Sequence, residues 1–131
     1  MRPPIATAVS FVDCINRGDV EGLAALMTAD HTLTVFAETP LVGRDANVEG
    51  WRSYASNFPH YVIAPHRLSE RGDVVAIVGH TTGSHLGLPD EEERALTLIW
   101  LARVRDGLVA EWTLIEDTPD NRREHALTDS D

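Results

Sequence analysis

The sequence predicts an α+β fold in which helices pack on one face of a curved, mostly antiparallel sheet. Two observations lead to this prediction: apolar residues recur at helical spacing in the first half of the chain, and strand-like segments separated by turn signals fill the second half. Helices followed by a run of strands are typical of the α+β class. Since no linker and no repeat interrupts the sequence, residues 1–131 are expected to form one domain.

The first half of the chain predicts three helices and one strand. Two prolines suit the start of the first helix, and Gly18 suits its end. Asp19 can cap a second helix, whose apolar residues run to Met27. A strand is expected at 32–37, and a third helix, capped by Asp45, follows it.

The second half predicts four strands and a last short helix. Hairpin-like turns are expected at RGD, GLPDEEE and RDG, and the run DEEER (90–94) is interpreted as a turn with solvated charges and no chemistry. The strands are expected within HYVIAPHRLSE, DVVAIVGHTTGSH, RALTLIWLARVR and LVAEWTLIE, and the helix within TPDNRREHAL.

Composition excludes several classes of partner and chemistry. The formal net charge of −10 argues against nucleic acid and anionic membranes as partners, because no basic stripe is present to neutralise phosphates. No segment is apolar for long enough to span a bilayer, and the first residues do not form a secretory signal. A single cysteine suits a reducing, cytoplasmic environment, and the absence of lysine excludes a Schiff base.

The chain resembles the NTF2-like superfamily, in particular its SnoaL-like branch, which is related to polyketide cyclases. The resemblance extends from about Ala8 to about Leu127 and lies in the order and spacing of FVDCINRGDVEGLAALMTADHTL, PLVGRDANVEGW, FPHYVIAPHRLSERGDVVAIVG, TGSHLGLP and VRDGLVAEWTLIED. It implies a conical, cystatin-like α+β barrel with three N-terminal helices and a pocket between helices and sheet. It also implies a homodimer built through the sheet.

Glu116 is the first candidate for catalysis. The face of the last strand that carries Trp112 and Leu114 ends on this carboxylate, because side chains alternate along a strand. An apolar surrounding would favour the protonated form, so that the carboxyl could exchange protons near neutrality. The resemblance implies the same role, although Asp117 leaves the register open by one residue. A strand that simply ends in water is the alternative.

His80 and His85 are candidates for a second acid/base group. They stand five residues apart, so at most one of them lines the pocket if the strand is regular. The resemblance places the histidine of the family's "GTHTG" turn on His85. It also places Trp100 where related cyclases often have another histidine. An exposed histidine is the alternative for each.

A flat hydrophobic ligand could be bound by aromatic and apolar residues on the strands and the third helix. Plain core positions are the alternative for them, and solvation is the alternative for the one carboxylate among them. The candidates are Trp100, Trp112, Leu98, Leu114, Trp51 and Tyr54, with Glu38 at the pocket mouth. The histidines show no metal-ligand spacing, so neither a metal nor another cofactor is expected.

Two hypotheses about function follow. The first is a cofactor-free cyclase, isomerase or dehydratase that acts on a small hydrophobic carbonyl compound, with Glu116 as the acid/base. The second is a non-catalytic domain that holds an apolar ligand or serves assembly, since the same fold hosts both. We favour the enzyme. The homodimer is supported by apolar residues on both faces of late strands, such as Ile99 and Leu101 opposite Leu98 and Trp100.

Overall fold

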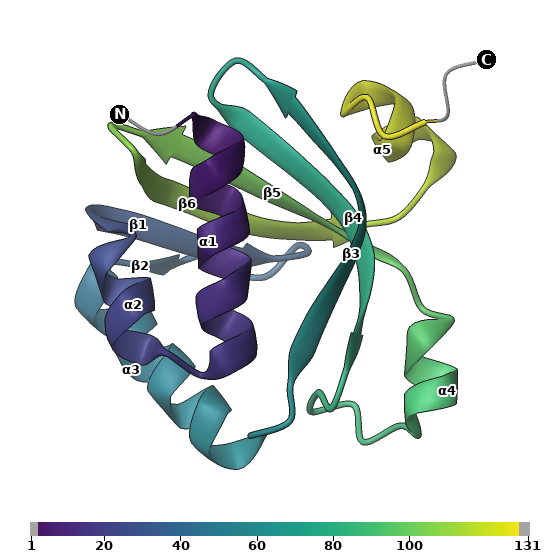
Figure 1. The fold of residues 1–131 in the computed structure, drawn as a ribbon, viewed down its shortest axis with the longest axis horizontal. Helices are drawn as coiled ribbons and strands as arrows, with labels where there is room; N and C mark the ends of the chain where they lie inside the picture. The colour runs from purple at the N-terminus through teal and green to yellow at the C-terminus, as the bar shows by residue number, and fades with distance from the viewer. Residues whose placement is uncertain (1–2, 129–131) are drawn as a thin grey trace.

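A computed structural model describes residues 3–128 as one mixed sheet with helices on both sides (Figure 1). The helices in this range are α1 (Pro4–Arg17), α2 (Val20–Ala25), α3 (Arg44–Asn57), α4 (Asp90–Arg94) and α5 (Pro119–Glu124). The strands are β1 (Met27–Val35), β2 (Leu41–Val42), β3 (Val62–Arg71), β4 (Val74–Thr82), β5 (Leu98–Arg105) and β6 (Leu108–Glu116).

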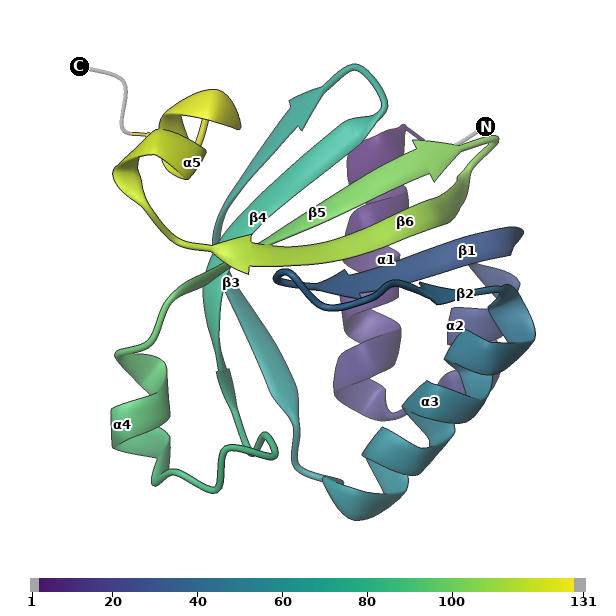
Figure 2. The same ribbon diagram turned by 180° about the vertical axis from the view of Figure 1, so that it is seen from behind.

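The sheet is curved and not closed, with the strand order β2-β1-β6-β5-β4-β3. β1 pairs with β6 in parallel, and every other pair of neighbouring strands is antiparallel. α1 lies in front of the sheet in Figure 1 and behind it in Figure 2, so it covers one face, which we call the concave face. The predicted α+β class, the three N-terminal helices and the short helix within TPDNRREHAL, which is α5, are confirmed, and α4 is added to them.

The ends of the first two helices follow from local chemistry. Gly18 adopts φ 65°, a left-handed conformation that glycine accepts without strain, and its N–H donates to the carbonyl of Ile15 at 3.1 Å. Asp19 caps α2 by accepting a hydrogen bond from the N–H of Gly22 at 2.9 Å. The expected extension of this helix through Met27 is wrong, because Met27 is the first residue of β1.

The two turns after β4 and β5 differ in how well the sequence predicts them. Between β5 and β6, Asp106 and Gly107 both have positive φ, 55° and 76°, as the two-residue turn of a tight hairpin requires. The segment 90–94, in contrast, is the helix α4 and not a turn. Its Glu93 is only 1% exposed, so the expected solvated charge cluster is wrong at this residue.

Two apolar clusters hold the layers together. On the concave face, Phe11 of α1 packs on Trp112 of β6, with ring centroids 4.8 Å apart, and Trp100 of β5 belongs to the same cluster. On the convex face, Leu127 packs with Ile99 of β5 and with Ala76 and Val78 of β4. The C-terminal segment therefore buries an apolar residue on which the dimer expectation was based.

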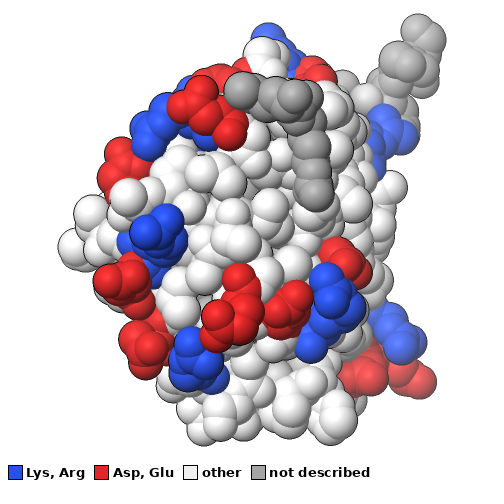
Figure 3. Space-filling model, turned by 60° about the vertical axis from the view of Figure 1, so that its left-hand side comes forward, with Lys and Arg blue, Asp and Glu red and all other residues white. Residues whose placement is uncertain are grey.

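The helices near the N-terminus carry mixed charges. Figure 3 shows acidic and basic side chains next to one another on one side of the molecule, around a mostly uncharged area. Two of the ion pairs join Arg17 to Asp13 at 3.0 Å and Arg52 to Glu21 at 3.6 Å. Within residues 3–128, no helix has the length and apolar character needed to cross a membrane.

Candidate functional site

A cavity of about 230 Å³ lies between α3 and the concave face of the sheet, and we call it the inner cavity. One face of α3 supplies Asn47, Trp51 and Tyr54, because residues three and four positions apart project together from a helix. Alternation along the strands turns apolar residues toward them. The remaining lining residues are Leu33, Val35, Leu41, Gly50, Tyr61, His85, Trp100, Trp112 and Leu114.

The structure brings six of the predicted site residues to this cavity. Apart from Glu116, three of the predicted residues do not line the cavity. Leu98 packs against the concave core, Glu38 is exposed after β1, and His80 lies on β4 with its ring against His66. The six that line it are Trp51, Tyr54, His85, Trp100, Trp112 and Leu114.

Glu116, the first candidate for catalysis, is an exposed residue at the end of β6 and does not line the cavity. The apolar surrounding expected for it is therefore not present. Asp117, one residue further, is held instead: Arg122 donates to both of its carboxylate oxygens, at 2.6 and 2.7 Å. Hydrogen bonding from Arg122, and to a smaller extent from Thr97, holds the pKa of Asp117 below its ordinary value.

His85 reaches the cavity from the turn after β4 and is held by Tyr54. The Tyr54 hydroxyl oxygen lies 2.8 Å from Nδ1 of His85 and accepts the backbone N–H of the same residue at 3.1 Å. Because a hydroxyl both donates and accepts, this contact suits either tautomer of the ring. Nε2 is therefore a base in one tautomer and an acid in the other. Burial above all raises the pKa of Tyr54, so its hydroxyl keeps its proton.

Glu93, which the sequence analysis did not consider, is a buried carboxylate near this pair. It accepts hydrogen bonds from the Thr81 hydroxyl and, at 3.5 Å, from the N–H of Ser84. Among the ion pairs of residues 3–128, none involves Glu93. Pro89 followed by acidic residues is a helix-start signal that could have predicted α4. It could not have shown which glutamate is buried.

His31 precedes the strand expected at 32–37, but it lies in β1 and is fully buried. Its Nδ1 is 2.7 Å from the carbonyl oxygen of Val109, so Nδ1 carries a proton and donates. Burial lowers the pKa of His31, which is therefore neutral near pH 7. The sequence held a signal for this position: His31, Leu33 and Val35 stand two positions apart, which places them on the same face of a strand.

Three buried side-chain atoms within residues 3–128 have no hydrogen-bond partner: Nε2 of His31, Oδ1 of Asn47 and Nε1 of Trp51. Asn47 directs its NH₂ group at backbone carbonyls, including that of Gly43 at 2.8 Å, and so joins α3 to β1 and β2. Buried polar groups without partners are uncommon in folded proteins. Two of these three residues, Asn47 and Trp51, line the inner cavity.

The described residues contain no cluster of three or more groups that could hold a metal ion. Two histidines do lie close together: Nε2 of His66 and Nδ1 of His80 are 2.6 Å apart. Burial first, and then the neighbouring His66, lower the pKa of His80. The pair lies outside the inner cavity.

The sequence model of the SnoaL-like domain matches residues 8–112. The chain belongs to this family. The match ends at Trp112, so the stretch that contains Glu116 lies beyond it. No curated protein matches the chain significantly.

Solved structures confirm the fold of this SnoaL-like chain. An uncharacterised cystatin-fold protein from Novosphingobium aromaticivorans is 16% identical, with a TM-score of 0.77 over 88% of this chain and 100% of its own. IdmH from Streptomyces antibioticus, described as a proposed polyketide cyclase, is 22% identical, with a TM-score of 0.68 over 88% and 93%. An epoxide hydrolase of the LEH-like type from M. tuberculosis is 13% identical, with a TM-score of 0.69 over 95% and 90%. At these identities the likeness shows the fold.

Proposed function

We propose that this SnoaL-like protein is a cofactor-free enzyme of the cyclase or isomerase type, acting on a small hydrophobic carbonyl compound in the inner cavity. One observation carries the proposal: an apolar cavity walled by aromatic rings has a tyrosine-held histidine, His85, at its edge. Family membership supports the class of reaction, since proteins of this fold include ones described as cyclases.

Binding rests on the apolar wall. The indole rings of Trp100 and Trp112 and the side chain of Leu114 offer flat, apolar surface to a ring compound, and burial of that surface supplies the affinity. Few polar groups interrupt the wall, which is typical of sites that bind small hydrophobic ligands. A carbonyl group would be the polar end of such a ligand.

We assign proton transfer to His85 in place of Glu116, because His85 lines the cavity and Glu116 does not. With Nδ1–H donated to the Tyr54 oxygen, Nε2 takes a proton from the carbon next to the carbonyl, and the electron pair of that C–H bond moves toward the oxygen. The imidazolium then returns the proton to another position of the same molecule. No bond to the protein forms, and nothing is oxidised or reduced.

The test is exchange of the protons next to the carbonyl of acetophenone in D₂O, followed by proton NMR. We expect the protein to accelerate exchange and His85→Gln to reduce the acceleration at least about 100-fold, the lower range for general acid–base catalysis. Leu114→Arg, which fills the cavity, should abolish both binding and exchange. Glu116→Gln is the matched control and should exchange like wild type. Unchanged exchange in His85→Gln would refute the assignment.

The second candidate, a non-catalytic binding domain, is favoured by a specific observation. Among the residues that line the inner cavity there is no carboxylate, although carboxylate chemistry was the basis of the catalytic hypothesis. If acetophenone binds the wild-type protein but its protons exchange no faster than in buffer, the binding function is the better description.

A further inference from the structure

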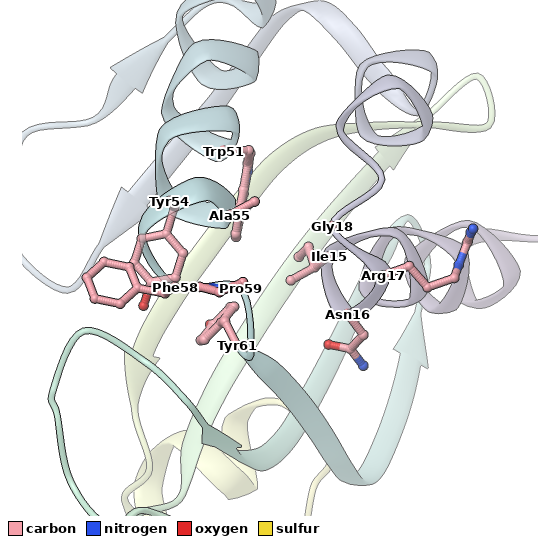
Figure 4. Close-up of a pocket in the computed structure, with 10 residues that line it drawn as sticks. All are labelled: Ile15, Asn16, Arg17, Gly18, Trp51, Tyr54, Ala55, Phe58, Pro59 and Tyr61. Carbon is pink, nitrogen blue, oxygen red and sulfur yellow. The ribbon is translucent and has the colours of Figure 1, made fainter.

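A second cavity adjoins the inner one, and aromatic rings separate the two. This outer cavity, also of about 230 Å³, lies between the end of α1 and the end of α3. Figure 4 shows Ile15 and Asn16 on one side of it and α3 on the other, while the side chain of Arg17 extends away. Three residues line both cavities: Trp51, Tyr54 and Tyr61. We call these three residues the aromatic wall.

The aromatic wall is continuous because each of its rings contacts the other two. The ring centroids of Tyr54 and Tyr61 are 4.9 Å apart with the rings nearly perpendicular, at 80°. Trp51 lies 6.1 Å from Tyr54 and 6.5 Å from Tyr61. The contacts of Tyr54 with Tyr61 and with Trp51 are edge-to-face, an arrangement that is favourable for aromatic rings. Tyr54 is also fixed by its hydrogen bonds to His85, so the rings are held in place from the loop after β4.

Volume makes this separation important for the ligand. Pockets for drug-sized molecules typically measure about 300–1,000 Å³, and the inner cavity alone falls below this range. The two cavities together would fall within it. Whether a ligand can use both volumes is decided by the three rings between them.

We propose that the aromatic wall sets the upper size limit of the ligand. The wild-type protein takes compounds of one or two fused rings in the inner cavity, and the outer cavity becomes usable only when a ring of the wall is removed. This inference rests on the proposed function for the location of the ligand, and it adds a class of substrate: a one- or two-ring carbonyl compound.

The test compares acetophenone, 2-acetylnaphthalene and 2-acetylanthracene, which carry the same carbonyl group on one, two and three rings, by equilibrium dialysis. The wild-type protein should bind the first two and bind the third at least about tenfold more weakly. Tyr61→Leu removes one ring of the wall and should improve binding of the three-ring ketone about tenfold or more. Trp51→Leu, a second wall variant, should do the same, so the test does not depend on the folding of a single protein.

Phe58→Ala is the matched control. Phe58 lines the outer cavity but not the inner one, so its removal enlarges the outer cavity without deleting a ring of the aromatic wall. Tyr54 loses its contact with the Phe58 ring, 4.7 Å away between centroids, but keeps its hydrogen bonds to His85. Binding of the three-ring ketone should not improve in this variant. An equal gain in Phe58→Ala, or wild-type binding of all three ketones with similar affinity, would overturn the proposal.

These outcomes are separable from failure of the proposed function. If no ketone binds the wild-type protein, or if Leu114→Arg does not weaken ketone binding, the ligand location itself is wrong. If acetophenone binds and exchanges its protons, the proposed function stands, whatever the wall variants do.

Discussion

Glu93 and Glu116 each have the opposite solvent exposure to the one that the sequence predicts. Glu116 ends an apolar strand face and was expected in an apolar cavity, yet it is exposed. Glu93 belongs to a run of acidic residues and was expected in water, yet it is 1% exposed. Alternation along a strand reports which face a side chain is on, but not how far the covering layer extends along that face. In both cases, burial depends on whether another part of the fold packs over the side chain.

The covering layers explain the difference. Along the concave face, cavity-lining residues of β6 end at Leu114, and Glu116, the next residue on that face, is beyond the cover. Glu93 is brought against β4 by the short helix α4, where the Thr81 hydroxyl meets its carboxylate. This contact spans twelve positions of the sequence and has no signature in local spacing.

The largest effect is expected from Glu93. Glu93→Ala leaves the Thr81 hydroxyl and the Ser84 N–H without their acceptor, so we expect the free energy of unfolding to fall by about 1–3 kcal/mol. Urea unfolding measures this change. Glu92→Ala, in the same helix but exposed, is the control and should stay within about 0.5 kcal/mol of wild type. Equal effects of the two substitutions would show that the burial of Glu93 contributes nothing.

His31 extends the comparison to a buried base. Its pKa is lowered in the folded state, so below the ordinary histidine value of about 6.5 the unfolded chain binds more protons, and stability falls as the pH falls. The slope cannot exceed about 1.4 kcal/mol for each pH unit from one proton. We expect the free energy of unfolding of wild type to fall between pH 7 and 5 more steeply than that of His31→Leu. Parallel curves would contradict this.

Asp117 sharpens the comparison between neighbours in the sequence. Asp117→Asn weakens the paired hydrogen bonds from Arg122 and should cost about 1 kcal/mol at pH 7, since the arginine is partly exposed. Because the folded pKa of Asp117 is lowered, its contribution is present above the ordinary carboxyl range and is lost as the pH falls through the folded value. The difference between wild type and variant should therefore shrink in acid. A constant difference would argue against the ion pair.

The smallest effect is expected at Glu116. Glu116→Gln changes an exposed side chain, so the free energy of unfolding should change by less than about 0.5 kcal/mol. Thermal unfolding followed by circular dichroism is sufficient to measure it. A larger loss would mean that this carboxylate has a structural role, and the contrast with Glu93 would then fail.

What the sequence predicts well in this chain depends on near neighbours. Gly18 ends α1, Asp19 caps α2, and Asp106 with Gly107 forms the β5–β6 turn, because each needs only residues a few positions away. Alternation also placed Trp112 correctly on the concave face. The first strand starts at Met27, earlier than expected, so it includes His31.

The parts of the site that the sequence could not predict depend on contacts between distant segments. His85 is joined to Tyr54 across 31 positions, and the two cavities exist only because α3 packs over the sheet. The homodimer through the sheet stays a prediction. One of its arguments is weaker than the sequence suggested, since Leu127 of the same chain already covers Ile99.

The inner cavity also gives the molecule an optical property. The chain has three tryptophans, and all of them, Trp51, Trp100 and Trp112, line this cavity. Almost all of the intrinsic fluorescence excited at the red edge of the absorption band therefore originates at its wall. An aromatic ketone that enters should quench or shift that emission without any label, so the protein itself reports whether its cavity is filled.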